Sequence, residues 1–241
     1  MHAARVASAV LMMYAWAPAA SGGQINFYWN DCLGDGSAEN KTIDCTASND
    51  IVEAIGSFIL SSPMPDFVAV EVVAEVCANN TTSPPRWWTF DPAAGACHDG
   101  SLSMTFDFSS LANHRCTDPF DASVVGGLAN YVVHDRYARI IGVGAVDASN
   151  ARALEPGVEY YGFRLALKLD KATGADSCAG CSIPAVIGLI SINAVGRAGS
   201  QELSTYAANS QIAAWNGGNY QECYGDAAQN RTWGQVKSLY R

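Results

Sequence analysis

The sequence predicts an all-β protein, an antiparallel β-sandwich of the jelly-roll or immunoglobulin-like type, with a loop-rich C-terminal extension and one short terminal helix. Three observations lead to this fold class. The chain contains 22 glycines and 9 prolines and only 15% charged residues, a balance that favours strands and loops over helices. Apolar residues alternate along residues 160–170, as in a half-buried strand. Residues 185–192 are almost continuously apolar, which is typical of a strand covered on both faces.

These two segments are expected to form an antiparallel hairpin on which the rest of the chain packs. In the first segment the odd positions are apolar, whereas Arg164, Lys168 and Asp170 fall on the other side. A polar turn separates the segments and contains Cys178 and Cys181, which are expected to staple it. Leu-Glu-Pro-Gly at residues 154–157 predicts a turn directly before this hairpin.

Further strands are expected before the hairpin. In residues 51–60, Val52, Ile55 and Ile59 have helical spacing, but the β-branched content and the following Ser-Ser-Pro favour an extended segment. The even-numbered residues of 67–77 are uniformly apolar and predict the core face of a strand. Residues 116–130 are expected to form an irregular connection. The other expected strands are residues 24–29, 42–46, 86–90, 102–108 and 131–146.

Three regions of the chain are predicted. Residues 1–19 begin with a basic segment, continue with a short apolar run and end with small residues, as before a signal-peptidase cleavage site. A secretory signal peptide ending at Ala19 is therefore expected. Residues 20–196 are assigned to the sandwich. Residues 197–241 are expected to form a polar extension, in which Trp233, Val236 and Leu239 predict a short amphipathic helix packing on the sandwich. Beyond the signal, no stretch reaches about 18 uninterrupted apolar residues, so no membrane span is expected in the mature chain.

The charge balance is acidic. The full chain has 14 Lys and Arg against 23 Asp and Glu, a net charge of -9. Removal of the predicted signal takes away Arg5 alone, which leaves 13 against 23, or -10. Nucleic acid is not an expected partner, because phosphate binding needs a clustered basic surface. The acidity fits the solubility of an exported protein.

Eight cysteines follow the predicted signal, and an even number in an exported chain indicates disulfides. Proximity in the sequence suggests the pairs Cys32–Cys45, Cys97–Cys116 and Cys178–Cys181, which leaves Cys77 for Cys223, although eight cysteines allow 105 pairings. Two other interpretations of Cys178-Ala179-Gly180-Cys181 stay open: a redox pair, which would stand at a helix N-terminus, and a zinc site, which would need a second Cys or His pair. A structural staple is favoured over both.

The sequence contains no motif of a hydrolase, kinase or nucleotide-binding protein, so no enzyme, catalytic residue or cofactor is predicted. His98, His114 and His134 are expected to lie in surface loops. A glycosidase would need two acids across a cleft, and the sequence does not place the available Asp107, Asp118, Asp121 and Glu159.

Metal binding has one weak pair of candidates. Asp31 and Asp35 lie in a turn-rich loop at residues 30–37 and could offer oxygen atoms to calcium. Leu33 stands where an EF-hand loop places a side-chain ligand, so a solvated loop is the preferred interpretation and no metal site is predicted.

Aromatic residues give the strongest indication of a ligand. Trp87, Trp88 and Trp215 could form an exposed platform on which a sugar ring stacks, because adjacent residues of a strand point to opposite faces and one of the first two would be accessible. The alternative is that these side chains fill the core. Further candidates are Trp29, Tyr160, Tyr220 and Tyr224.

The chain resembles a group of uncharacterised exported bacterial proteins. The resemblance rests on Trp29-Asn30-Asp31-Cys32, the Trp87-Trp88 pair, Glu159-Tyr160-Tyr161-Gly162-Phe163, Cys178-Ala179-Gly180-Cys181 and the tail from Thr232-Trp233-Gly234 to Tyr240-Arg241, and it covers nearly all of the mature chain. It transfers no catalytic or binding residue. It implies that the sequons at Asn40, Asn80 and Asn230 need not be glycosylated in such a host.

The sequence thus leads to two functional hypotheses. The first is an exported, non-catalytic protein of the extracellular space, periplasm or cell envelope, with a structural or adhesive role and another surface protein as its partner. The second is a carbohydrate-binding module that uses the aromatic platform to bind a polysaccharide. They differ in whether the tryptophan side chains are accessible and lie together on one face.

Overall fold

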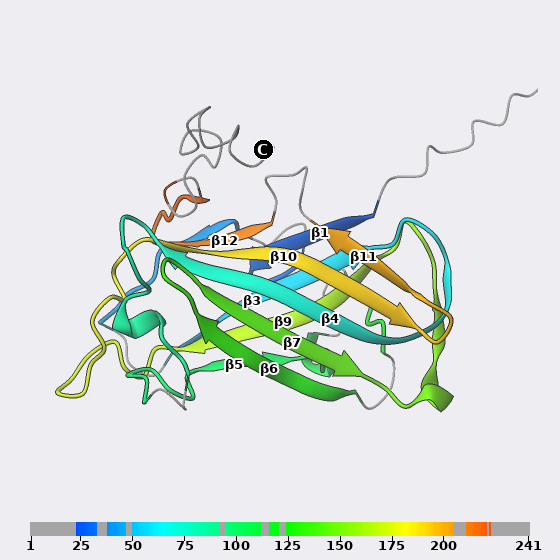
Figure 1. Cartoon of the computed structure of the whole chain (residues 1–241), viewed down its shortest axis with the longest axis horizontal. Helices are drawn as coiled ribbons and strands as arrows, with labels where there is room; N and C mark the ends of the chain where they lie inside the picture. Colours follow the sequence, from blue (N-terminus) through cyan, green and yellow to red (C-terminus); the bar gives the residue numbers. More distant parts are fainter. Residues whose placement is uncertain are drawn as a thin grey trace, which may run out of the picture.

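The strands form two sheets that pack face to face, so the predicted all-β sandwich is confirmed (Figure 1). The computed structural model describes residues 23–32, 38–46, 50–91, 95–111, 116–120, 124–204, 211–220 and 222. One sheet has four strands in the order β1-β3-β9-β5, and the other has eight, with the path β2-β12-β10-β4-β7-β6, β11 beside β10 and β8 beside β4. The strand pairs are antiparallel apart from β2 with β12, which is parallel. The elements are β1 (Gln24–Trp29), β2 (Asn40–Lys41), β3 (Ile51–Ile59), β4 (Met64–Ala78), η1 (Arg86–Trp88), β5 (Leu102–Thr105), η3 (Ser109–Leu111), β6 (Val125–Val133), β7 (Ala138–Ala145), η4 (Ala148–Asn150), β8 (Arg152–Leu154), β9 (Glu159–Lys168), β10 (Ala185–Gly196), β11 (Ser200–Ser204) and β12 (Ile212–Trp215).

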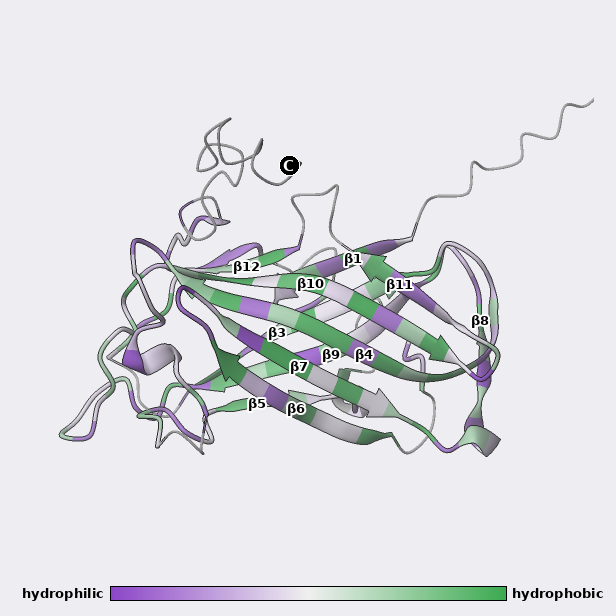
Figure 2. Ribbon diagram, viewed as in Figure 1, coloured by the Kyte–Doolittle hydropathy of each residue, from purple (hydrophilic) through white to green (hydrophobic). Residues whose placement is uncertain are grey.

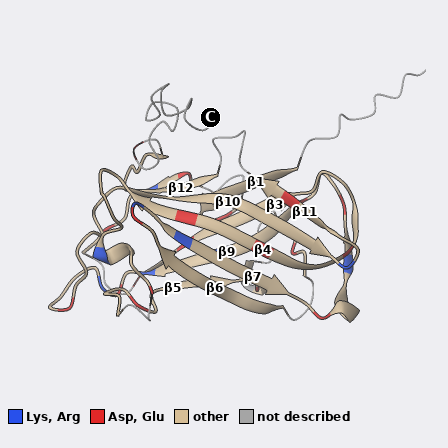
Figure 3. Cartoon of the chain, viewed as in Figure 1, with Lys and Arg blue, Asp and Glu red and all other residues tan. Residues whose placement is uncertain are grey.

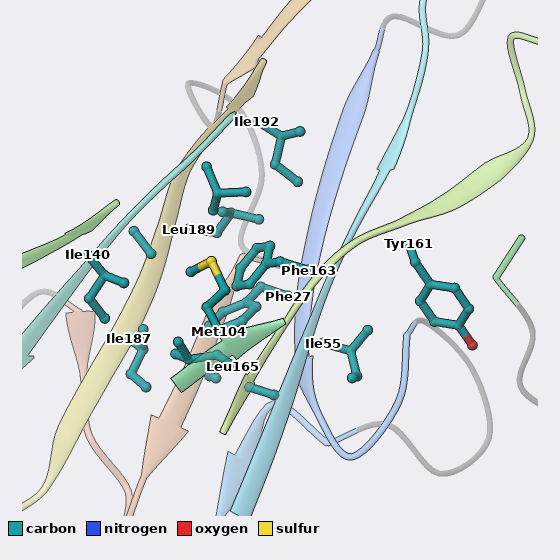
Figure 4. Close-up of a cluster of buried hydrophobic side chains, with 14 of the residues drawn as sticks. Phe27, Ile55, Met104, Ile140, Tyr161, Phe163, Leu165, Ile187, Leu189 and Ile192 are labelled. Atoms are coloured by element: carbon teal, nitrogen blue, oxygen red, sulfur yellow. The ribbon is translucent and has the colours of Figure 1, made fainter. Parts of the chain in front are cut away.

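The main core lies between the two sheets and follows the period of two. In β4, the even-numbered Val70, Val72, Ala74 and Val76 are buried, as predicted for the core face, while Val68 is partly buried. Figure 4 shows side chains of the four-stranded sheet meeting those of the eight-stranded sheet across this core. Alternating burial therefore fixes which face of each strand turns inward.

The predicted hairpin is wrong. β9 pairs with β3 and β5 in the four-stranded sheet, whereas β10 pairs with β4, β11 and β12 in the eight-stranded sheet. Residues 169–184 therefore cross from one sheet to the other, and they do not form the turn of a hairpin. Both segments are strands as predicted, but a period of two specifies the faces of a strand and not its neighbour.

Several boundaries also differ from the sequence interpretation. Residues 51–60 and 67–77 do form strands, as β3 and β4. Residues 86–88, expected within a strand, form the 3-10 turn η1. β6 begins at Val125, inside the predicted irregular connection, and β2 is shorter and earlier than the expected strand at 42–46.

The sandwich continues past residue 196. β11 and β12 both pair with β10, so the predicted boundary separates strands that belong to one sheet. The predicted signal peptide at residues 1–19 and the predicted terminal helix with Trp233, Val236 and Leu239 lie outside the described residues.

A second, smaller core covers the outer face of the four-stranded sheet. Ile55, Ser57 and Tyr161 lie on this face and are at most 2% exposed; Figure 4 shows Ile55 and Tyr161 on the far side of the strands from Phe163. The Phe108 ring stacks on Tyr161 with centroids 4.7 Å apart, and Thr117 forms a parallel bridge to Tyr160. Burial raises the pKa of the Tyr161 phenol to about 12. The chain after β5 therefore wraps round the edge of this sheet and covers the part of its outer face around Ile55, Ser57 and Tyr161, while Ile51 and Lys168 at the other end stay exposed.

Gly56 allows the closest packing in the main core. A Cβ atom at Gly56 would overlap the ring of Phe163, which is itself stacked on Phe27 at 5.4 Å. Gly56→Ala is expected to lower the free energy of unfolding by about 1–3 kcal/mol, because the core has no room for the added methyl group. Urea unfolding of the oxidised protein measures this change.

Gly199→Ala is the matched control, because a Cβ atom there meets nothing within 4 Å. Unfolding midpoints that are equal for the wild type and the Gly56 variant would contradict the packing described here.

Candidate functional site

Four tryptophans meet at one end of the sandwich and form an aromatic cluster. Trp87 and Trp88 of η1 lie with their ring centroids 4.9 Å and 5.1 Å from that of Trp215, which ends β12. Trp29, at the end of β1, lies 6.0 Å from Trp215. The ring of Phe90 approaches Trp87 and Trp88 edge-on. These elements are far apart in the sequence, so the cluster joins both sheets and the loop of η1.

The hydrogen bonds of the aromatic cluster tie it to the backbone. Trp29 Nε1 donates to Ala214 O and Trp215 Nε1 donates to Cys181 O, both at 2.7 Å. Tyr131 of β6 donates from its hydroxyl to Trp88 O, and burial raises the pKa of this phenol, which keeps the donor protonated. Trp87 Nε1 and Trp88 Nε1 are buried and have no hydrogen-bond partner among the described residues.

The predicted carbohydrate platform is not formed by these residues. Trp87, Trp88 and Trp215 are 0%, 1% and 0% exposed, so none of them presents a ring face to a ligand. Because residues 86–88 form a turn, Trp87 and Trp88 do not alternate between opposite faces and both enter the core. Of the other candidates, Trp29 and Tyr160 are buried, Tyr220 is partly exposed, and Tyr224 lies outside the described residues.

The disulfides connect distant loops, so the pairing suggested by proximity in the sequence is wrong. The structure contains Cys32–Cys116, Cys45–Cys181 and Cys97–Cys178. Cys77 is also disulfide-bonded, and its predicted partner Cys223 lies outside the described residues. Cys178 and Cys181 therefore do not bond to each other. They hold the crossing segment 169–184 to two separate loops, and the redox-pair and zinc interpretations do not apply to them.

These three disulfides indicate an oxidising, extracytoplasmic environment. They close sequence separations of 84, 136 and 81 residues. In the chain-entropy model, one bond closing a loop of this size contributes roughly 4–5 kcal/mol by restricting the unfolded chain.

His98 packs beneath the aromatic cluster and is not a surface histidine. It is 0% exposed, and its ring centroid lies 4.4 Å from that of Trp87. Nδ1 lies 2.9 Å from Trp87 O, so Nδ1 carries the proton and donates it. Nε2 lies 3.3 Å from Asp170 Oδ1, which also accepts a hydrogen bond from Ser101 Oγ at 2.7 Å. Burial lowers the pKa of the His98 imidazole, against the opposing effects of Trp87 O and the Asp170 carboxylate. In this tautomer Nε2 has no hydrogen-bond partner among the described residues, so His98 is tied to η1 through Trp87 O, and Ser101 makes the hydrogen bond to Asp170 of the crossing segment.

The other histidines lie elsewhere. His134 is exposed, at the turn between β6 and β7, and stacks on Tyr137 at 4.7 Å. His114 lies outside the described residues.

The acids considered for catalysis are not brought together. Glu159 Oε1 accepts hydrogen bonds from Asn26 Nδ2 at 2.8 Å and Ser57 Oγ at 2.6 Å on the outer face of the four-stranded sheet. Asp107 Oδ1 accepts from Ser109 N, and Asp118 Oδ1 accepts from Phe120 N, each within a local turn. Asp121 lies outside the described residues.

The candidate metal ligands are only partly described. Asp31 Oδ1 accepts a hydrogen bond from Cys32 N at 2.7 Å, and Asp35 lies outside the described residues. Over the described ranges, no group of three or more His, Cys, Asp or Glu side chains could hold a metal ion. Within the same ranges, no helix is long and apolar enough to cross a membrane.

β10, β4, β7 and β6 lie side by side in the eight-stranded sheet (Figure 2), and the outer face of these strands is partly exposed to solvent. The side chains of Val73, Ile141, Val143 and Ala145 form an apolar strip across β4 and β7, with Val143 36% exposed. Figure 3 shows few charged residues over β10, β4, β7 and β6. This surface is the candidate functional site, although the sequence analysis did not select it. The odd register of residues 67–77, with its alternating valines and glutamates, was the available signal.

Two polar pairs flank the apolar strip. Glu75 Oε1 accepts hydrogen bonds from Arg139 Nε at 3.1 Å and Nη2 at 2.5 Å, across β4 and β7. Glu71 Oε2 accepts from Asn193 Nδ2 at 2.8 Å, across β4 and β10. Glu75 and Arg139 therefore neutralise each other, while Glu71 keeps its negative charge beside the strip.

Comparison with known proteins gives little further information. No family model and no curated protein matches the chain. Among solved structures, the native conformation of E. coli alpha-2-macroglobulin is similar at 15% sequence identity and a TM-score of 0.28, over 84% of this chain and 10% of that one. The chain thus spans about a tenth of that protein's length.

The disulfide connectivity predicts a specific set of linked peptides. When the oxidised protein is digested without reduction, the peptide that contains Cys178 and Cys181 should be joined to two others, one with Cys45 and one with Cys97. Mass spectrometry measures this directly. Recovery of that peptide alone, closed by an internal Cys178–Cys181 bond, would disprove the connectivity.

The buried His98 predicts a loss of stability in mild acid. Its folded-state pKa is lowered, so the unfolded chain binds a proton first as the pH falls. The contribution of the neutral imidazole is complete above about pH 6.5, the unfolded pKa, and declines below it. The urea midpoint is therefore expected to fall between about pH 7.5 and about pH 5.5.

His98→Asn keeps a donor for Trp87 O but does not titrate, so this variant should be less stable and should depend less on pH over the same interval. His134→Asn, at an exposed position, should keep the wild-type dependence. A His98→Asn variant with the full wild-type dependence would refute the assignment to His98.

Proposed function

We propose that the protein is an exported, non-catalytic protein of the extracellular space or the cell envelope, with a structural or adhesive role. Its working surface is the outer face of the eight-stranded sheet, and its partner is another surface protein. The carrying observation is the apolar strip of Val73, Ile141, Val143 and Ala145, in which Val143 is exposed and the other three side chains are half-buried.

An apolar surface in contact with water is unfavourable in free energy. Exposed apolar patches flanked by polar residues are typical of protein interaction sites, since removing the apolar area from water favours association. Here Glu75 is paired with Arg139, and Glu71, across from Val143, is an exposed carboxylate that accepts a hydrogen bond from Asn193. A partner that covers the strip therefore has to leave Glu71 hydrated or supply a positive charge to it, because burial of an isolated charge would cost several kcal/mol.

The disulfides and the charge support the location and the class of partner. Three disulfides between distant loops suit a domain that works outside the cytoplasm. The net charge of -9 disfavours nucleic acid. The strip is made of valine, isoleucine and alanine, whose flat surface complements the apolar part of another protein better than the hydroxyl groups of a sugar.

An adhesion assay tests this proposal. Beads coated with the purified, oxidised protein are expected to bind to cells of the producing strain from which this chain has been deleted, so that the beads meet another surface protein and not a second copy, and free protein should compete. Val143→Lys should weaken this binding at least about tenfold, because the long, hydrated lysine side chain would stand in the middle of the strip and the partner would have to remove its water even though Glu71 lies across from it. Val143 is exposed, so the variant should unfold at the wild-type midpoint.

Val158→Lys is the matched control, since Val158 is equally exposed at 36% but precedes β9. Wild-type beads that bind no better than beads coated with an unrelated acidic protein would refute the adhesive role. Equal binding by the Val143 and Val158 variants would refute the assignment to this face.

A further inference from the structure

β6 is the longest open edge strand in the part of the chain that the structure describes. It has nine residues and closes the path of the eight-stranded sheet, where it pairs with β7. The other terminal strands are shorter: β2 has two residues and β5 has four. β1, at the edge of the four-stranded sheet, has six residues and lies against β11 and β12 of the facing sheet, while β6 likewise approaches β5 near Gly127 and Met104. Figure 1 shows β6 along one border of the sandwich.

Apart from the bulge at residues 128–130, this edge lacks the features that normally prevent strand pairing. Edge strands in natural proteins commonly carry lysine, proline or inward-pointing charges that block the addition of another strand. Residues 124–133, Val-Val-Gly-Gly-Leu-Ala-Asn-Tyr-Val-Val, contain no charged residue and no proline. The two valines at the ends of β6 are largely exposed, Val125 at 71% and Val133 at 44%. An unprotected apolar edge of this length favours pairing with another strand.

The ladder between β6 and β7 determines which backbone groups face outward. At the turn, His134 N donates to Tyr137 O at 2.8 Å. In an antiparallel ladder, hydrogen-bonded pairs recur at every second position, so Val132–Arg139 and Asn130–Ile141 are the next two. Past the bulge at residues 128–130, Gly127–Val143 continues this series. The N–H and C=O groups of Gly126, Tyr131 and Val133 therefore point away from β7.

We infer that β6 is a self-association site, at which two copies of the chain join their eight-stranded sheets edge to edge. The two β6 strands lie antiparallel about a two-fold axis between Leu128 and Ala129. In this register Gly126 of one copy pairs with Tyr131 of the second copy, so that outward-facing backbone groups meet. Val125 of one copy then lies beside Val132 of the second copy, and both side chains are on the outer face of the joined sheet.

A second copy fits this edge because the edge is self-complementary. An isologous contact requires each half of the strand to match the other half. In this register the Gly126–Tyr131 backbone pair and the Val125–Val132 side-chain pair each occur once on either side of the two-fold axis. The bulge lies at the axis, so the faces of the strand agree on both sides of it. Each copy carries a net charge of -9, and the uncharged β6 lets two acidic chains approach where repulsion is least.

Sedimentation of the oxidised full chain over a series of protein concentrations tests the inference. The wild type should change from monomer to dimer as the concentration rises. Val125→Lys should raise the dissociation constant at least about tenfold, because the lysine would be buried against the uncharged Val132 of the second copy. Val132→Glu should have a similar effect. A wild type that stays monomeric throughout would overturn the inference.

The double variant Val125→Lys/Val132→Glu tests the register. Each lysine would meet the glutamate of the second copy, whereas the two positions are seven residues apart on one strand and cannot pair within a copy. Dimerisation should therefore return toward the wild-type constant, and the recovery should shrink at high salt. A double variant that dissociates at least as readily as either single variant would overturn the proposed pairing.

This self-association and the proposed adhesion use different surfaces and can fail separately. Val143→Lys should keep the wild-type dimerisation constant while it weakens adhesion to cells. Val125→Lys should unfold at the wild-type midpoint, since its side chain is exposed, and should keep its adhesion to cells. A Val125→Lys variant that dimerises as well as the wild type would place self-association on another surface and so refute the role of β6.

Discussion

The passage of the chain between the two sheets after β9 is the constraint on which one whole end of the molecule depends. Residues 169–184 carry the chain from the four-stranded sheet to the start of β10 in the other. Cys178 and Cys181 bond this segment to the loops of Cys97 and Cys45, and Asp170 approaches the buried His98. Trp215 donates its indole N–H to Cys181 O. The aromatic cluster can therefore close only once the segment is in place, and the segment is held in turn by the cluster.

The strands could be predicted from the sequence because the period of two is a local signal. Residues 67–77 and 160–170 show it plainly. The even positions of the first segment and Phe163, Leu165 and Leu167 of the second turn inward as the pattern indicates, whereas the register shift at Gly162 puts Tyr161 on the outer face. The partner of each strand is not a local property. β9 and β10 are neighbours in the sequence and both strongly apolar, yet they lie in opposite sheets, because a sandwich can receive consecutive strands on either side.

The candidate site could be predicted less well for the same physical reason. Disulfide pairing depends on which loops meet in space, and the sulfur atoms joined here are separated by 81 residues or more in the sequence. Trp87 and Trp88 follow two prolines and turn into a 3-10 helix, so that alternation along a strand does not apply to them. The exposed strip contains ordinary aliphatic residues, which sequence patterns assign to a core. The strip is distinguished only by its position: it lies on the outer face of the eight-stranded sheet, whereas the chain after β5 packs on the outer face of the four-stranded sheet.

The nesting of the disulfides has a mechanical consequence. Cys45–Cys181 encloses most of the strands, from β3 to β9, within one covalent ring, inside which Cys97–Cys178 forms a second. Tension applied at the two ends of the chain would pass through the disulfides and bypass the strands inside this ring. β1 precedes all of the bonded cysteines, so it lies outside the ring and could be peeled away and lengthen. A molecule built in this way would yield by a short extension and then stop.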